Sequence, residues 1–385
     1  MVETTIGGLV ADGAISMGDG YRTKRSEHGQ PGYRIIRVAD VRDESVFLDG
    51  DDFVSSEYAA PMGSKIAQAG DVLLTTKGTV GRVAVMPASA EPAVYSPQLC
   101  YFRIHDHDVL DPRFLRYWFR SAEFTGQSSY LQGNTDMAPY ISLADLRATR
   151  ITVPAIDRQR AIAEVLGALD DKIAVNARLA ATADDLARAR VEGAVAGYGT
   201  SVQLGDVTEF HNKRRVPLSS RERESRNGEI PYYGANGIVD HVDEPIFDGQ
   251  HVLVGEDGTV VTSSGTPVVN LIWGPAWVNN HAHVLSGRGV STALLRVLIS
   301  RTVVDSFVTG AVQPKLSMGN LRKVALEVPA SAALGRVEED VQALTHTLMV
   351  RQDENRVLES LRDALLPQLT SGKLRVREAA EMAGL

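Results

Sequence analysis

The chain has 385 residues, enough for two or three domains of ordinary size, and its composition is that of a globular protein. It contains no run of about 18 apolar residues and no basic-then-apolar start, so the sequence predicts neither a membrane span nor a signal peptide. The single cysteine, Cys100, excludes a disulfide framework or a cysteine-rich zinc site and fits a cytoplasmic location. A formal net charge of −8 argues against a nucleic-acid ligand unless basic residues are gathered locally.

The first domain, residues 1–153, is predicted to be mixed α/β (α+β). Short β-branched runs, for example at 35–38 and 72–76, are separated by glycine, proline and aspartate turns. Asp111, followed by proline, makes a cap and first turn for a helix over 114–124. Basic residues crowd the early part of this domain, and three of them are candidates for DNA contact: Arg22, Lys24 and Arg25.

A long helix is predicted next, over residues 154–198. Asp157 is placed to cap it, and a group of glycines marks its end. Its apolar residues recur at alternating spacings of four and three, which predicts a packing seam with a heptad repeat. The seam residues that we expect to pack are Ile162, Leu166, Leu169 and Ile173.

The second half follows the same order. Residues 199–328 predict another mixed α/β domain, with a helix over 294–304 that Ser291 caps. Residues 329–375 predict the second long helix, and residues 376–385 are left as a tail. The seam of the second helix is formed by Val341, Leu344, Leu348, Leu358 and Leu365. Two helices of about 40 residues, each on the order of 60 Å long, can pack as an antiparallel coiled coil. The alternative is that they are ordinary core helices of two adjacent domains.

The two halves also share sequence. PYISLADLR at 139–147 returns without a gap as PKLSMGNLR at 314–322, and Gly-Thr-Val occurs at 78–80 and again at 258–260. A basic cluster recurs at the corresponding place of the second half: Lys213, Arg214 and Arg215. An internal duplication predicts two equivalent half-molecules, which suits a bipartite ligand such as duplex DNA. The alternative for either cluster alone is a solvated loop surface.

These features together resemble the specificity subunit of a type I restriction–modification system. The resemblance is carried by YYGANGI at 232–238, GDVLL at 70–74 with KGTVGR at 77–82, ISLADL at 141–146 followed by ITVP at 151–154 and Gln159, and LPQLTSGK at 366–373. The chain departs from the family in two places. Arg158 stands where the family usually has an acidic residue, and residues 331–336 of the second copy lack the glutamine.

The resemblance implies two pseudo-symmetric target recognition domains, each followed by a spacer helix. Each domain would read one half of a split double-stranded DNA target, the halves lying roughly one helical turn apart. The helices and domain backs would hold two modification subunits, which bring S-adenosylmethionine, and restriction subunits would add ATP-driven cleavage. The chain itself would hold no cofactor.

Motifs for catalysis are absent from the sequence. There is no Asn-Pro-Pro-Tyr or Asp-Pro-Pro-Tyr tetrapeptide for amino-methyl transfer, and no phosphate-binding loop of the Gly-x-x-x-x-Gly-Lys-Ser/Thr type. His281 and His283 could share one face of a strand, but no cysteine lies nearby, and we do not expect a metal site. We therefore expect a non-catalytic subunit.

Polar loop side chains are candidates for base readout, since Arg or Lys pairs with guanine and Asn or Gln with adenine. The candidates are Lys77, Thr79, Arg82 and Asn134 in the first domain, and Tyr232, Tyr233, Asn236, Gln313 and Lys315 in the second. A buried or turn-forming role is the alternative for each. Two other functions stay open: a coiled-coil scaffold that bridges two protein partners without touching DNA, and an enzyme whose site the sequence does not reveal.

Overall fold

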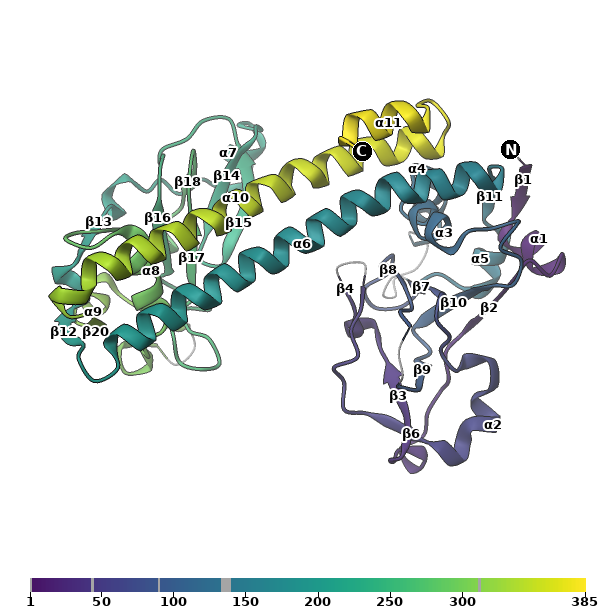
Figure 1. The fold of residues 1–385 in the computed structure, drawn as a ribbon, viewed down its shortest axis with the longest axis horizontal. Helices are drawn as coiled ribbons and strands as arrows, with labels where there is room; N and C mark the ends of the chain where they lie inside the picture. Colours follow the sequence, from purple (N-terminus) through teal and green to yellow (C-terminus); the bar gives the residue numbers. More distant parts are fainter. Residues whose placement is uncertain (1, 43–44, 89–90, 133–139, 311–312) are drawn as a thin grey trace. The chain divides into compact units, whose positions relative to one another are not determined.

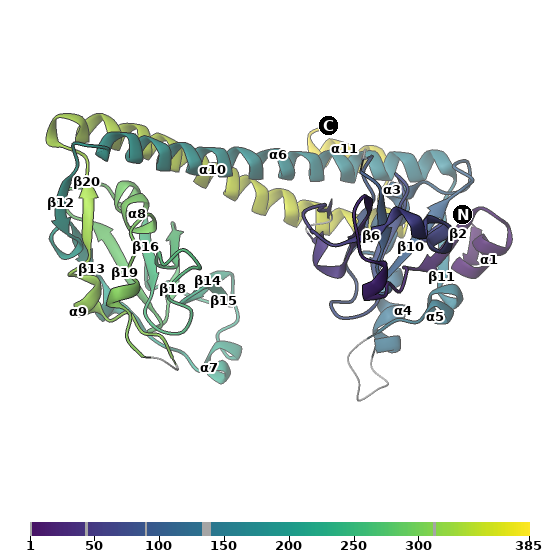
Figure 2. The same ribbon diagram turned by 90° about the horizontal axis from the view of Figure 1, so that it is seen from below.

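The computed structural model describes residues 2–42, 45–88, 91–132, 140–310 and 313–385. The chain forms two compact units (Figures 1 and 2), and each unit contains one of the predicted domains with part of each long helix. Unit 1 is Met1–Ile173 with Val357–Leu385, and unit 2 is Ala174–Arg356. Among the described residues, no helix is both long and apolar enough to cross a lipid bilayer.

The domain of unit 1 is built around an antiparallel sheet of four strands. Their order is β2 (Ile15–Asp19), β10 (Leu99–Ile104), β7 (Val72–Thr75) and β8 (Val83–Val85). A smaller sheet has the order β6 (Phe53–Ser55), β3 (Gly32–Ile36) and β9 (Ala93–Tyr95), with β3 parallel to β9. β1 (Val2–Thr5) pairs with β11 (Arg150–Val153), and β4 (Val41–Arg42) pairs with β5 (Ser45–Val46). The helices are α1 (Ile6–Ala11), α2 (Ala59–Met62), α3 (Pro112–Trp118), α4 (Ala122–Gln132) and α5 (Leu143–Ala148).

The domain of unit 2 has the same topology. Its four-stranded sheet has the order β13 (Thr208–Phe210), β19 (Ala282–Gly287), β16 (His251–Gly255) and β17 (Val269–Ile272). Its three-stranded sheet has the order β15 (Gly237–Val242), β14 (Ile230–Gly234) and β18 (Trp277–Val278), with β14 parallel to β18. β12 (Thr200–Gln203) pairs with β20 (Ala325–Val328), and the helices are α7 (Ser220–Glu224), α8 (Thr292–Ser300) and α9 (Met318–Leu321).

The strand pairings confirm two equivalent halves. β3 and β14 each lie between an antiparallel and a parallel neighbour, so they hold equivalent positions. The segment PYYGANG at 231–237, which has no evident match in the sequence of the first domain, therefore does have a structural counterpart. The duplication extends through regions in which the side chains have diverged beyond recognition.

The central strand of each large sheet is buried on both faces. In β7, Val72 and Leu74 pack into the cluster that contains the long helices, while Leu73 packs on the opposite face, toward the smaller sheet. In β16, Val252 and Val254 face the helices and Leu253 faces the smaller sheet. This follows from the two-residue period of a strand, because successive side chains point to opposite faces. Each large sheet is thus the middle layer of its domain.

The short helices begin where the sequence predicts them but end earlier. The Asp111 carboxylate accepts hydrogen bonds from the backbone N–H groups of Arg113 and Phe114 and caps α3. The helix predicted over 114–124 ends at Trp118, and α4 begins separately at Ala122. Likewise the Ser291 hydroxyl caps α8, which stops at Ser300.

The two long helices are α6 (Ile156–Val195) and α10 (Ser331–Thr370), and they lie side by side within each unit (Figures 1 and 2). In unit 1, Ile162, Leu166 and Leu169 of α6 share one buried cluster with Leu358 and Leu365 of α10, with Ile173 packed at its edge. In unit 2, Ala187 and Val191 of α6 share a cluster with Val341 of α10, with Leu344 at its edge. Leu348 is also buried. Because the start of each helix packs on the end of the other, the pair is antiparallel, as predicted.

Residues 376–385, left as a tail in the sequence analysis, contain a further helix, α11 (Val376–Ala383). The backbone turns after Thr370 at Gly372, whose φ of +78° lies in the left-handed region that favours glycine. Ala379 is fully buried in the core of unit 1, with Leu374 and Val376 packed against the same cluster. The end of the chain is therefore part of the folded unit.

Half-buried carboxylates connect the domains to the helices in both units. In unit 1, Asp170 of α6 accepts hydrogen bonds from Arg116 and Tyr117 of α3 and from Arg362 of α10, the last at 3.0 Å. In unit 2, Asp184 of α6 forms ion pairs with Arg188 of its own helix at 2.9 Å and with Arg296 of α8 at 2.5 Å. Each domain thus uses one arginine of its short helix, Arg116 or Arg296, to hold α6.

The glutamine that opens α6 has a structural role. Gln159 is fully buried, its side-chain oxygen accepts from the Asp111 N–H at 3.0 Å, and its amide group donates to the carbonyls of Val109 and Pro154. The second copy lacks this glutamine, yet the Glu338 carboxylate accepts from the N–H of Ser291, the counterpart of Asp111. Glu338 lies one helical turn after the position in α10 that corresponds to Gln159. The hydrogen bond to the N–H at the start of the short helix is therefore retained, but from a different position of the long helix.

Replacing Gln159 by leucine is expected to lower the free energy of unfolding by about 2 kcal/mol, because a buried donor and buried acceptors lose their partners. Chemical denaturation of the full chain measures this change. Gln342→Leu is the matched control, since Gln342 is an exposed glutamine of α10 and should change the free energy by less than about 0.5 kcal/mol. Equal effects of both substitutions would contradict the assigned role.

Candidate nucleic-acid interface

In unit 1 a short loop follows the central strand β7. Thr76 donates its N–H to the Gln98 carbonyl at 2.9 Å, and its own carbonyl accepts from the N–H of Ile141 at 3.0 Å. The next residue, Lys77, is exposed, and Gly78 follows with a φ of +80°. A left-handed residue at that point turns the backbone sharply, which glycine does without strain. The main chain of Thr76 is thus fixed by hydrogen bonds to two neighbouring segments, while the Lys77 side chain lies in solvent.

In unit 2 the loop after β16 has the same construction. Glu256 donates its N–H to the His281 carbonyl at 2.8 Å, and its carbonyl accepts from the N–H of Leu316 at 2.9 Å. Asp257 follows, and then Gly258 with a φ of +84°. Lys77 and Asp257 therefore occupy the same backbone position in the two repeats, with opposite charges.

A hollow adjoins the first of these loops, and we name it the first hollow. It measures about 780 Å³ and lies between the loop and the end of β3. Among the residues that line it, Arg22, Arg37 and Lys77 carry positive charge and none is acidic. Within the described part of the chain, neither the Arg22 guanidinium nor the Lys77 ammonium has a hydrogen-bond or ion-pair partner, whereas Arg37 pairs with Asp52 at 2.5 Å. The first hollow therefore presents unsatisfied donors.

The second hollow adjoins the equivalent loop of unit 2. It measures about 330 Å³ and is lined by the β14–β15 turn with Asn236, and by Asp257, Asn279 and His281. Asp257 accepts a hydrogen bond from the His281 ring at 2.6 Å between Oδ1 and Nδ1. Lys77, Gln98 and Ser96 of the first hollow correspond to Asp257, His281 and Asn279 of the second. The hollows are equivalent in place and opposite in charge.

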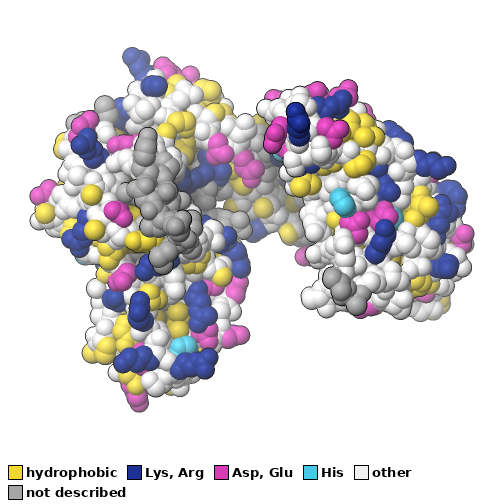
Figure 3. Space-filling view, turned by 180° about the vertical axis from the view of Figure 1, so that it is seen from behind, with side chains coloured by type: hydrophobic (Ala, Val, Ile, Leu, Met, Phe, Trp, Pro, Cys, Tyr) yellow, Lys and Arg dark blue, Asp and Glu magenta, His cyan; other side chains and the backbone are white. Residues whose placement is uncertain are grey.

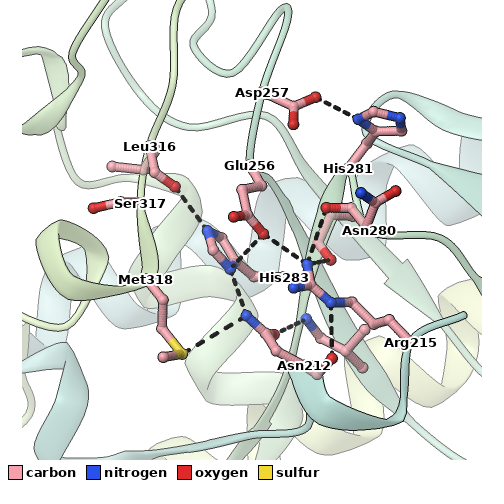
Figure 4. Close-up of polar contacts among 12 residues, drawn as sticks. Asn212, Arg215, Glu256, Asp257, Asn280, His281, His283, Leu316, Ser317 and Met318 are labelled. Carbon is pink, nitrogen blue, oxygen red and sulfur yellow. Dashed lines mark hydrogen bonds and ion pairs between the residues drawn. The ribbon is translucent and has the colours of Figure 1, made fainter. Parts of the chain in front are cut away.

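Behind the second hollow lies a buried polar network (Figure 4). The fully buried His283 donates from Nε2 to the Leu316 carbonyl at 2.7 Å and accepts at Nδ1 from the Asn212 amide at 2.8 Å. Arg215 donates to Glu256 and to the Ala282 carbonyl, both at 2.7 Å. These contacts fix the strand and the loop from which Asp257 and His281 project.

Burial lowers the pKa of His283 below its ordinary value of 6.5. Between the lowered pKa and 6.5, the unfolded chain binds a proton that the folded chain does not bind. The free energy of unfolding therefore rises with pH through this window, and the contribution of His283 is complete above 6.5. We expect denaturation between pH 5 and pH 8 to show this rise, and His283→Gln to flatten it. An unchanged pH profile in the variant would contradict a buried, neutral His283.

In the first domain, the predicted contact residues divide between the hollow and its surroundings. Arg22 and Lys77 line the hollow. Lys24 and Arg25 are exposed beside it, at the short 3-10 turn Arg25–Glu27. Thr79 is exposed in the loop, where its carbonyl accepts from the Thr75 hydroxyl. Arg82 donates to the Val41 carbonyl at 3.1 Å, so part of its guanidinium has a structural partner. Asn134 lies outside the described residues.

In the second domain, the basic cluster divides in the same way. Lys213 is exposed. Arg214 is exposed as well, although its guanidinium donates to the Ile246 carbonyl at 2.6 Å and lies over the ring of Phe247. Arg215 has only 13% of its side chain exposed and belongs to the buried network, so its side chain supports the loop.

The two tyrosines of YYGANGI are interior residues. Tyr232 is 2% exposed, and its hydroxyl accepts from the N–H of Leu218 at 2.9 Å. Tyr233 is 8% exposed and packs in the cluster between the two sheets. In contrast, Asn236 lines the second hollow, Gln313 is exposed, and the exposed Lys315 directs its ammonium to within 3.9 Å of Glu256. Within this motif the two tyrosines are thus part of the interior, and Asn236, in the turn between β14 and β15, is exposed.

Several lining residues escaped the sequence analysis: Arg37, Gln98, Asp257, Asn279 and His281. A signal existed for Asp257, because the shared Gly-Thr-Val segment aligns it with Lys77. His281 was considered only as a metal ligand. The structure separates it from the buried His283 and pairs it with Asp257, and no group of three or more potential metal ligands occurs among the described residues.

Basic and acidic side chains are mixed on the surfaces of both domains. Figure 3 shows lysine and arginine over the part of unit 1 that holds β3, β6 and β9, with acidic side chains and histidine among them, and a similar mixture on unit 2. The locally basic feature is the first hollow, whose lining holds three cations and no carboxylate, and it coexists with a net charge of −8.

Comparison with known proteins agrees with this arrangement. The profile of the type I restriction modification DNA specificity domain matches twice, at residues 13–183 and 200–345. The chain is 22% identical over 427 residues to the type I restriction enzyme MjaIX specificity subunit of Methanocaldococcus jannaschii, covering 98% of this chain and 96% of that one. A protein described as a type I restriction enzyme specificity subunit of Haemophilus influenzae is 31% identical over 145 residues, which span 37% of this chain and only 36% of that one.

A solved structure has the same fold. The crystal structure of the type I restriction-modification system S subunit from M. genitalium matches with a TM-score of 0.59 at 17% identity, covering 96% of this chain and 95% of that one. Two copies of the specificity domain, in two units of equal topology joined to paired long helices, leave no other assignment. The chain belongs to the family of type I restriction–modification specificity subunits, the non-catalytic DNA-recognition components of these systems.

Proposed function

We propose that this chain reads a bipartite DNA target, with one domain for each half-site. The observation that carries the proposal is the presence of equivalent hollows, beside Lys77 in one unit and Asp257 in the other, on a shared backbone with different side chains. A common docking geometry with divergent polar residues is suited to reading two different sequences. The exposed Arg22, Lys24 and Arg25 beside the first hollow supply phosphate contacts.

The partners follow from the family. The paired helices α6 and α10 and the backs of the domains hold two modification subunits, and restriction subunits join the same assembly. S-adenosylmethionine and ATP bind to those partners. The complex works in the cytoplasm, where the DNA of its host is accessible.

Selection from random duplexes tests this function. The full chain is assembled with the modification subunits of its host and incubated with a pool of random double-stranded DNA, and the retained duplexes are sequenced. We expect a motif of two short defined segments separated by an undefined spacer of fixed length. A single continuous motif, or binding without any sequence preference at low and at high salt, would contradict the proposal. Sequencing the methylated adenines of the source genome should return the same two segments.

A further inference from the structure

The two hollows differ most at the residue that their shared backbone holds in the same place. Lys77 and Asp257 each follow a residue whose N–H and carbonyl are both bonded to neighbouring segments, and each precedes a left-handed glycine. We propose that Lys77 and Asp257 are the specificity-determining residues of the two half-sites, and that they select bases of opposite hydrogen-bonding character. This inference rests on the function proposed above.

Lys77 can only donate hydrogen bonds. Its ammonium is exposed and has no partner among the described residues, and the nearby Arg22 is likewise a donor without a partner. No acidic side chain lines the first hollow. In the major groove, guanine is the base with two adjacent acceptors, O6 and N7, and lysine or arginine pairs with them. The first half-site therefore contains a guanine opposite Lys77.

Asp257 can only accept hydrogen bonds when ionised. It accepts from the Nδ1–H of His281, which also lines the hollow and whose side chain is 51% exposed, and Nε2 of the neutral ring is a second acceptor. The nearby cations Lys315 and Arg215 are both directed at Glu256 behind the hollow, at 3.9 Å and 2.7 Å. Cytosine and adenine carry the exocyclic amino groups that donate in the major groove. The second half-site therefore contains one of these two bases opposite the Asp257–His281 pair.

The experiment compares the DNA motifs selected by variants of the full chain, each assembled with the modification subunits and offered the same pool of random duplexes. Lys77→Asp is expected to lower the preference for guanine at one position of one half-site by roughly ten- to a hundredfold, with the other half-site unchanged. Lys77→Arg retains the donors and should keep the guanine. Asp257→Asn should relax one position in the other half-site only.

Matched controls separate a base contact from a general effect of charge. Lys323→Asp and Asp185→Asn make the same changes at exposed positions remote from the hollows and should leave both half-sites intact. Weaker binding by Lys77→Asp with an unaltered motif would assign Lys77 to a phosphate and overturn the inference. A change in both half-sites from one substitution would overturn it too. If the unaltered chain selects no bipartite motif, the proposed function itself fails. If the unaltered chain selects such a motif and the variants select the same one, only the assignment of Lys77 and Asp257 fails.

Discussion

Replacing Asp170 by alanine is expected to destabilise the chain by about 3 kcal/mol, the largest effect on folding among the substitutions considered. The carboxylate is 17% exposed and receives Arg116 and Tyr117 from α3 and Arg362 from α10. Removing it takes the shared carboxylate away from two guanidinium groups, each about 15% exposed, of which Arg362 keeps an ion pair with the exposed Asp363 at 3.0 Å. The substitution therefore weakens the contact of the domain with both long helices at once.

Chemical denaturation of the full chain measures this effect. Asp171→Ala is the matched control, because the neighbouring Asp171 is exposed on the same helix and should cost less than about 0.5 kcal/mol. The double substitution Asp170→Ala with Arg362→Leu should recover part of the loss, since it removes one of the two cations that share the Asp170 carboxylate. A loss for Asp170→Ala no larger than for Asp171→Ala would show that the carboxylate does not hold the junction.

Removing the basic cluster beside the first hollow is expected to have the largest effect on DNA binding. In the triple variant Arg22→Ala, Lys24→Ala, Arg25→Ala, three exposed cations are lost without loss of a side-chain hydrogen bond or ion pair among the described residues. Each phosphate contact contributes about 0.9 to the slope of log affinity against log salt. The slope should therefore fall by about 2.7, and the affinity at about 0.1 M salt by roughly a few hundredfold.

Titration of a fixed duplex at several salt concentrations gives both quantities. The control variant Lys373→Ala, Arg375→Ala, Arg377→Ala removes the same number of exposed charges from another part of unit 1 and should leave the slope unchanged. The selected motif should also be unchanged in the triple variant, because phosphate contacts carry no sequence information. Equal slopes in the two variants would exclude the cluster from the interface.

The repeat, the long helices and their packing were predictable because they rest on periodicity and on short identical segments. The seam of Ile162, Leu166 and Leu169 lies where the heptad spacing places it. The equivalence of β3 and β14 was not predictable from the sequence. The two strands have the same neighbours in their sheets, but their side chains differ, and a comparison of sequences detects only side chains. The contact of Glu338 with Ser291 was hidden for a related reason. The Glu338 carboxylate lies one helical turn from the position expected for a glutamine and accepts from the N–H that corresponds to that of Asp111. An alignment of the two repeats by position does not detect this replacement.

The candidate site was only partly predictable. Residue type alone suggested Tyr232 and Tyr233 as surface contacts, but both lie on the middle strand of the three-stranded sheet, where their rings are buried on its two faces for their apolar area. The sequence groups Arg215 with its basic neighbours. In the structure it is largely buried, because it forms an ion pair with Glu256, which is distant in the sequence. Asp257 has no residue type that by itself suggests DNA contact. It is found through the duplication, in which it holds the backbone position of Lys77.

The loops after β7 and β16 are anchored by main-chain hydrogen bonds, including those of Thr76 and Glu256, and the side chains of Lys77 and Asp257 take no part in these bonds. On the readout proposed above, exchange of a single codon at either place alters what is recognised at little thermodynamic cost to folding. A family built in this way would diversify its targets by point changes while one architecture is inherited intact. A host acquiring such a change would modify a new set of sites with otherwise identical machinery.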